Sequence, residues 1–165
     1  MTEKATFAAG CFWGVESAFM EVEGVLSTSV GFMGGHTSDP SYKDVCYTET
    51  GHAEVCQVEY DPSKVDYDRL LEVFWHIHDP TQLNRQGPDV GSQYRSAIFA
   101  HSEEQLAAAK ASKDALQGSG KHARPVVTQI VMFDEYFLAE EYHQQYNQKN
   151  GLPSCHLPPP PASKA

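Results

Sequence analysis

Strand-like and helix-like apolar spacings alternate along the chain, and this order constrains the fold more than any other feature of the sequence. Residues 5–9, 26–33 and 51–60 each predict a strand. Residues 11–21 predict a helix between the first two strands, because apolar side chains recur there at steps of three and four. These side chains are Phe12, Val15, Phe19 and Val22. A helix with one apolar face packs that face on the sheet.

Capping residues mark two further helices. Asp66 can cap a helix that follows the third strand and stops before Pro80. Ser102 and Gln105 have the spacing of a capping box, at the start of a helix that ends near Gly118. The other predicted elements are strands over 94–101 and 126–133, a helix over 138–149, and loops over 34–50 and 79–93.

The length of 165 residues fits one compact domain. We predict a single two-layer α+β domain with a mixed sheet, flanking helices, a ferredoxin-like core and long coil segments. This domain occupies residues 1–150. Residues 151–165 predict a flexible C-terminal tail, because the proline run from Pro158 to Pro161 cannot join a packed core.

The charge of the chain excludes some classes of partner. The 22 acidic and 12 basic residues give a formal net charge of −10, which repels nucleic-acid phosphates and anionic lipid surfaces. No apolar run approaches the roughly 18–20 residues of a membrane span, and a secretory signal pattern is absent. Four cysteines are too few and too widely spaced for a disulfide scaffold. Together these features predict a cytoplasmic monomer.

Cys11 lies where the first strand gives way to the first helix, with Gly10 before it and Gly14 after it. Backbone N–H groups and the positive end of the helix dipole stabilise an anion at a helix start. This placement favours a reactive thiolate. A buried structural cysteine is the alternative, because free cysteine is among the most buried residue types.

Five motifs, taken together, resemble the peptide methionine sulfoxide reductase A family. The resemblance extends from about residue 4 to residue 150, in order and with family-like spacings. The motifs are Gly10-Cys11-Phe12-Trp13-Gly14, Gly31-Phe32-Met33-Gly34-Gly35, Pro40-Ser41-Tyr42, Gly51-His52-Ala53-Glu54-Val55 and the run from Gln86 to Ser96.

The resemblance implies roles for the residues in these motifs. Glu54 matches the carboxylate that donates a proton to the sulfoxide oxygen, and Tyr42 and Tyr94 match phenols that hydrogen-bond this oxygen. Phe12 and Trp13 match the apolar pocket around the S-methyl group of the substrate. The implied substrates are oxidised proteins and free methionine-S-sulfoxide, and neither a cofactor nor a metal is implied.

The resemblance also implies how the thiol is recycled. Cys11 matches the nucleophile, which becomes a sulfenic acid and then a disulfide that thioredoxin reduces. Cys155, in the C-terminal region, is the predicted resolving cysteine, with Cys46 in reserve and Cys56 structural. Asp89 matches a carboxylate that binds the substrate backbone or helps to order the site.

Three other functions remain as alternatives. One is a cysteine hydrolase with His52 as base, which needs an imidazole within reach of the sulfur and a third group to orient it. Another is a metal site, although His76-x-His78 and Cys155-His156 lack the spacing of a four-ligand zinc site. The third is a module that binds oxidised methionine without turnover, which an activity assay with a dithiol distinguishes.

Overall fold

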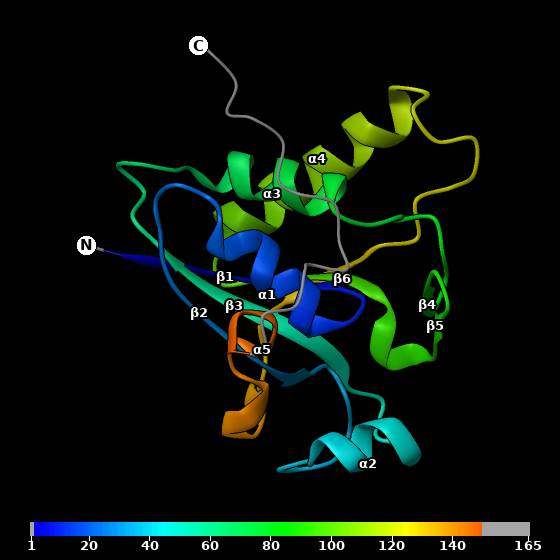
Figure 1. Ribbon diagram of the computed structural model, residues 1–165. Helices are drawn as coiled ribbons and strands as arrows, with labels where there is room; N and C mark the ends of the chain where they lie inside the picture. The colour runs from blue at the N-terminus through cyan, green and yellow to red at the C-terminus, as the bar shows by residue number, and fades with distance from the viewer. Residues whose placement is uncertain (1, 150–165) are drawn as a thin grey trace.

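Six strands form one mixed sheet across residues 2–149, the part of the chain that the computed structural model describes (Figure 1). Their order is β7-β6-β1-β3-β2-β8, and neighbouring strands are antiparallel except for the parallel pair β6 and β7. The strands are β1 (Glu3–Ala9), β2 (Val25–Met33), β3 (Ala53–Tyr60), β6 (Ser96–Ala100), β7 (Gln129–Met132) and β8 (Phe137–Leu138).

The four central strands have a split β-α-β arrangement. α1 (Phe12–Met20) joins β1 to β2, and these two strands run in the same direction with β3 antiparallel between them. The chain then passes through α3 (Tyr67–His76) to β6, which pairs with the other edge of β1. The resulting order, β6-β1-β3-β2, is that of a ferredoxin-like core, so the predicted fold class is confirmed. α4 (Glu103–Gly118) leads on to β7.

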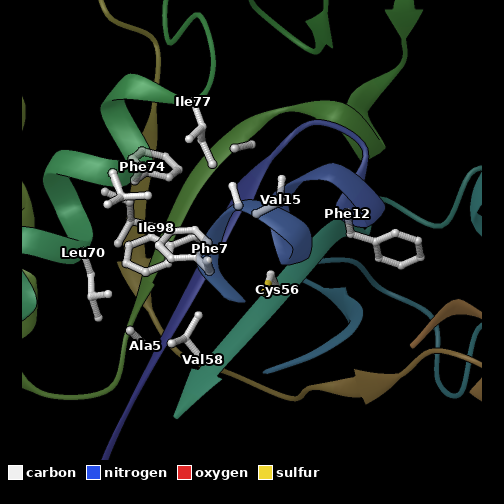
Figure 2. Packing of buried hydrophobic residues seen from close by; sticks show 14 of the residues in the cluster. Ala5, Phe7, Phe12, Val15, Cys56, Val58, Leu70, Phe74, Ile77 and Ile98 are labelled. Carbon is white, nitrogen blue, oxygen red and sulfur yellow. The ribbon is translucent and has the colours of Figure 1, made fainter. Parts of the chain in front are cut away.

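The main core lies between the sheet and the helices α1, α3 and α4. The ring of Phe7 on β1 stacks on Phe19 of α1, with centroids 5.0 Å apart, and on Phe74 of α3, 5.3 Å apart. Figure 2 shows Leu70 and Phe74 of α3 beside Phe7 and Ile98 of the sheet. Burial confirms the predicted apolar face of α1, which comprises Phe12, Val15, Phe19 and Val22.

A smaller apolar cluster covers the opposite face of the sheet. Met33, Val55 and Phe99 are buried there, and Phe133 and Tyr136 from the segment between β7 and β8 pack against them. Both faces of the central strands are therefore covered. This arrangement leaves the ends of the strands and the loops that follow them as the place for a site.

The predicted helix caps are present, with one difference. Asp66 caps α3 by accepting a hydrogen bond from the Arg69 N–H at 2.8 Å. Ser102 caps α4 by accepting from the Gln105 N–H at 3.1 Å. The side chain of Gln105, however, accepts from the N–H of His101 at 3.0 Å and not from that of Ser102. The reciprocal half of the predicted capping box is thus displaced by one residue.

The predicted loop over 34–50 contains a short helix, α2 (Tyr42–Tyr47). Ser41 and Asp44 form a reciprocal capping box at its start. The Ser41 hydroxyl accepts from the Asp44 N–H at 3.1 Å, and the Asp44 carboxylate accepts from the Ser41 N–H at 3.0 Å. The glycines and polar residues of this segment predict a loop, although the spacing of Ser41 and Asp44 is that of a capping box.

The helix predicted over 138–149 is wrong for most of its length. The segment contains the end of β8, a 3₁₀ turn η2 (Glu141–His143) and a short helix α5 (Tyr146–Lys149). Gln145 interrupts the helical path, because its φ is 51° and its N–H donates to the carboxylate of Glu16 at 2.6 Å. A tertiary partner thus replaces the hydrogen bond that a continuous helix would make.

Smaller differences concern boundaries. The loop over 79–93 contains a hairpin of β4 (Arg85–Gln86) and β5 (Asp89–Val90). The strand predicted from residue 94 starts at Ser96, because a 3₁₀ turn η1 (Ser92–Tyr94) precedes it. The strands predicted over 51–60 and 126–133 are shorter at one or both ends and comprise Ala53–Tyr60 and Gln129–Met132.

Replacing Phe7 by alanine should destabilise the domain strongly. The side chain is fully buried and stacks on rings from two helices, so its removal leaves a cavity that costs about 3–5 kcal/mol. Urea unfolding measures the loss. Leu26→Ala on β2 is the control, since that side chain is 53% exposed, and it should change the free energy of unfolding by less than about 0.5 kcal/mol. Equal losses of unfolding free energy in the two variants would mean that Phe7 is not at the centre of the core.

Candidate active site

The turn between β1 and α1 presents Cys11. Gly10 has a φ of 98°, a left-handed conformation that suits glycine, and it reverses the chain directly after the strand. Cys11 is the N-cap residue of α1, and its carbonyl accepts from the N–H of Val15 at 3.3 Å. The Cys11 side chain is partly exposed, whereas Phe12 is buried. The thiol therefore lies at the positive end of the helix and can be reached from solvent.

The side chain of Glu54 reaches the same turn. It lies on β3 opposite Phe32 of β2 and is 1% exposed. Its Oε1 accepts a hydrogen bond from the backbone N–H of Phe12 at 3.1 Å. The bond joins the carboxyl group of the central strand to the residue that follows Cys11. A buried carboxyl group and a thiol thus share the start of one helix.

Two phenols border the carboxyl group. Tyr42 is the first residue of α2, and Tyr94 is the last residue of η1. Burial raises the pKa of both phenols, and the charge of Glu54 raises each pKa further. Both therefore keep their protons at neutral pH and act as hydrogen-bond donors.

Aromatic rings form a wall beside the thiol. The indole of Trp13 stacks on Tyr146 with centroids 3.9 Å apart and on Tyr42 at 6.0 Å. Phe12 also stacks on Tyr42 at 6.0 Å and lies 6.5 Å from Trp13, so the three rings pack around one another. The indole N–H of Trp13 donates to Nδ1 of His143 at 3.0 Å, so its one polar atom is bonded. The wall therefore consists mainly of ring faces packed on one another.

His143 and Tyr146 are parts of this wall that the sequence reasoning missed. His143 is 1% exposed, and burial lowers its pKa, which keeps Nδ1 available as an acceptor. The sequence does show three aromatic side chains close together, Tyr142, His143 and Tyr146. A helix over 138–149, however, gives no reason to expect them beside Trp13.

Buried polar side chains hold this C-terminal segment in place. The carboxylate of Glu16 on α1 accepts from the Gln145 backbone at 2.6 Å and from the Thr28 hydroxyl at 2.7 Å. The amide of Gln144 pairs with both backbone groups of Val30, at 2.8 and 2.9 Å. The wall around Trp13 is therefore fixed to α1 and β2 by directional bonds.

The other cysteines have different surroundings. Cys46 is partly exposed on α2, one helical turn after Tyr42. Burial raises the pKa of the Cys46 thiol. Cys56 is fully buried on β3, and its pKa is raised well above the usual value, which makes it inert. Cys155 lies outside the described residues.

The surroundings of His52 do not fit a general base. Its Nδ1 accepts from the N–H of Gly35 at 3.0 Å, and its Nε2 lies 2.7 Å from the carbonyl of Thr37. Both ring nitrogens thus bind the loop after β2. Among residues 2–149, no group of three or more His, Cys, Asp or Glu side chains is arranged to hold a metal ion. No helix in the same range is long and apolar enough to cross a membrane.

The assembled parts define a class of protein. A partly exposed cysteine at a helix start, together with a buried carboxyl group and two protonated phenols, is the arrangement of a protein that can carry a reactive thiol. The model of one family, peptide methionine sulfoxide reductase, matches residues 3–165. The chain belongs to this family, as its motifs predict, and is an oxidoreductase.

Individual relatives agree with this assignment. The peptide methionine sulfoxide reductase MsrA of Methanosarcina acetivorans is 60% identical over 150 residues, which are 91% of this chain and 80% of the relative. MsrA 1 of Nostoc sp. is 62% identical over 147 residues, 89% of this chain and 90% of the relative.

Solved structures share the fold. The reduced form of Mxr1 from Saccharomyces cerevisiae superposes with a TM-score of 0.85 at 38% identity, covering 91% of this chain and 86% of that one. Methionine sulfoxide reductase A of Corynebacterium diphtheriae gives a TM-score of 0.82 at 39% identity, covering 93% and 77%. The likeness therefore extends over nearly the whole described chain.

Replacing Glu16 by glutamine should remove a pH dependence of stability. Burial raises the pKa of Glu16 above its usual 4.5, so the native state keeps this proton to a higher pH than the unfolded chain does. Ionised Glu16 then costs stability, and the cost grows as the pH rises from about 4.5 through the native pKa.

Urea unfolding across this range measures the effect. The free energy of unfolding of wild type should fall relative to Glu16→Gln as the pH rises. Glu21→Gln, at an exposed position at the end of the same helix, is the control and should follow wild type. An unchanged pH profile in Glu16→Gln contradicts the interpretation.

Proposed function

We propose that the protein reduces methionine-S-sulfoxide, in oxidised proteins and as the free amino acid, with Cys11 as the nucleophile. The observation that carries this proposal is the hydrogen bond from the Phe12 N–H to Glu54 at 3.1 Å. It brings an acid to the turn that carries the thiol, and sulfoxide reduction requires both.

The chemical step transfers one oxygen atom. The Cys11 thiolate attacks the sulfoxide sulfur while Glu54 gives a proton to the sulfoxide oxygen. The attack joins the two sulfurs. The protonated oxygen then passes to the Cys11 sulfur while the sulfur–sulfur bond and the bond from oxygen to the methionine sulfur break, so methionine leaves and Cys11 becomes a sulfenic acid. The methionine sulfur is reduced and the cysteine sulfur is oxidised, so the electrons balance.

The surroundings of Glu54 suit a proton donor. Burial disfavours the charged form of a carboxyl group, and Glu54 is 1% exposed. The phenols of Tyr42 and Tyr94 remain protonated and donate hydrogen bonds to the same oxygen. These donors stabilise the negative charge that develops as the thiolate attacks.

The remaining site residues position the substrate. Phe12 and Trp13 receive the S-methyl group in the aromatic wall described above. Asp89, on the partly exposed strand β5, binds backbone N–H groups of a peptide substrate. A pocket for one methyl group and an acceptor for a backbone suit methionine sulfoxide in a peptide.

Replacing Cys11 by serine should abolish reduction with every reductant, because an alcohol supplies almost no anion at neutral pH. The assay is release of methionine from a sulfoxide peptide with dithiothreitol. Cys46→Ser is the matched control and should still release the first methionine. Turnover by purified Cys11→Ser, once host enzyme is excluded, would assign the nucleophile to another residue.

Replacing Glu54 by glutamine should lower the rate of reduction by roughly 10²–10⁴, the usual contribution of general acid catalysis. The amide oxygen of glutamine can still accept from the Phe12 N–H, so the fold is kept. Single-turnover release of methionine measures the loss, and Glu59→Gln on the same strand is the control. A near wild-type rate at neutral pH means that Tyr42 or Tyr94 supplies the proton instead.

Recycling of Cys11 involves the C-terminal tail. Cys155 in residues 151–165 attacks the sulfenic acid and forms a disulfide, which thioredoxin then reduces. A structure of Mxr1 from Saccharomyces cerevisiae in complex with Trx2 supports this reductant; it superposes with a TM-score of 0.63 at 25% identity. Residues 1–150 form the catalytic domain of a monomer in this proposal.

Replacing Cys155 by serine should separate the two halves of the cycle. The variant should release one methionine per enzyme and accumulate a sulfenic acid that dimedone traps, and it should lose turnover with thioredoxin. Mass spectrometry of wild type after one equivalent of sulfoxide identifies the disulfide. A peptide pair of Cys11 with Cys155 supports the proposal, whereas a pair with Cys46 transfers the role to α2.

A further inference from the structure

Arg95 is a cation in a cavity that holds no anionic side chain. The cavity has a volume of about 480 Å³ and lies between the loop after α3, the turn η1 and strand β7. Arg95 is the one charged residue in its lining. The lining consists of Gly51, Gln82, Leu83, Asn84, Ser92, Arg95, Ser96, Val127 and Gln129.

The guanidinium of Arg95 is bonded to neutral acceptors. Its Nη1 donates to the carbonyls of Gly51 and Ser92, both at 3.0 Å, and its Nε donates to Oε1 of Gln129 at 3.2 Å. Nη2 has a long contact of 3.5 Å with the carbonyl of Gly34. Among residues 2–149, the ion pairs do not include Arg95.

The charge of Arg95 is therefore not balanced by a carboxylate. Burial is the cause that lowers the pKa of Arg95, which agrees with the absence of a carboxylate from the lining. A partly buried cation without a counter-charge is unusual in a chain of net charge −10. An anion that entered the cavity would lower this electrostatic cost.

Two amide side chains in the lining are oriented as donors. Oε1 of Gln82 accepts from the N–H of Gly87 at 2.7 Å, and Oε1 of Gln129 accepts from Arg95. Rotation of either amide by 180° would lose these bonds. Their NH₂ groups are thus held away from those partners and available to a ligand. Asn84 and Ser92 add an amide and a hydroxyl to the same lining.

From this donor set we infer that the cavity beside Arg95 binds a small oxyanion, of the phosphate or carboxylate type. The ligand bonds to the guanidinium of Arg95 and to the NH₂ groups of Gln82 and Gln129. Guanidinium and amide groups are donors that recognise such oxygens, and no acidic side chain in the lining repels them. The lining of this cavity includes none of Cys11, Tyr42, Glu54 and Tyr94, so the inference does not rest on the proposed sulfoxide chemistry.

Isosteric variants test the site without disturbing the fold. Gln82→Glu and Gln129→Glu each keep the oxygen that accepts a protein hydrogen bond and replace the NH₂ group by a negative oxygen. Ala107→Glu, at an exposed position on α4, adds the same charge outside the cavity and is the control. Circular dichroism checks that all three variants are folded.

The experiment is a titration with inorganic phosphate at constant ionic strength, followed by the side-chain amide resonances of the full chain. Wild type and Ala107→Glu should show saturable shifts at Gln82 or Gln129. The two cavity variants should bind at least about tenfold more weakly, since one lost charge-assisted contact is worth this factor. Acetate in a parallel titration shows whether the site takes a planar carboxylate as well as a tetrahedral anion.

Three results would overturn the inference. They are the absence of saturable shifts in wild type with both oxyanions, equal shifts with chloride, and unchanged affinity in both cavity variants. Without saturable shifts, the cavity binds neither oxyanion. Equal shifts with chloride would mean that the effect is charge screening. Unchanged affinity in both variants would mean that the anion binds elsewhere on the surface.

Discussion

One hydrogen bond, from the backbone N–H of Phe12 to the carboxyl group of Glu54, organises the proposed active site. It connects the start of α1 with the central strand β3, although the two residues are 42 positions apart in the sequence. The split β-α-β arrangement makes the contact possible, because β1 and β3 are neighbours in the sheet and α1 begins where β1 ends. The thiol and the acid are therefore placed by the fold and not by local sequence.

The aromatic wall depends on a second set of buried polar contacts. Glu16 binds the backbone of Gln145, and Gln144 binds that of Val30, so the segment after β8 is held against α1 and β2. This segment brings His143 to the indole of Trp13. The side chains of Glu16 and Gln144 are buried and hydrogen-bonded, which restricts the segment to one arrangement. The wall is thus held to the rest of the domain by directional bonds as well as by packing.

The periodicity of apolar residues predicted the helices and strands that pack in the core. It did not predict the chain path where hydrogen bonds to distant residues determine that path. The buried face of α1 and the cap Asp66 could be predicted from spacing alone, because each is indicated by residues within a single helix. The path around Gln145 did not follow, because its N–H is taken by a carboxylate from another helix.

The site itself was predictable only in part. Spacing marked Cys11 as a residue at a helix start, and the family motifs brought Glu54, Tyr42 and Tyr94 to it. Neither source indicated His143, whose role depends on a contact with Trp13 across 130 positions. The lack of a carboxylate beside Arg95 could not be predicted either, because the sequence does not show which side chains surround an arginine in the fold.

In our account, three fixed sides surround the substrate sulfur: the Cys11 thiol, the oxygen donors around Glu54, and the wall at Trp13. A sulfoxide sulfur is pyramidal, so one epimer alone can meet all three at once. The most direct test is reduction of the two resolved sulfoxide epimers of a methionine peptide with dithiothreitol. The account predicts reduction of the S epimer and none of the R epimer. Equal rates for the two epimers would contradict it.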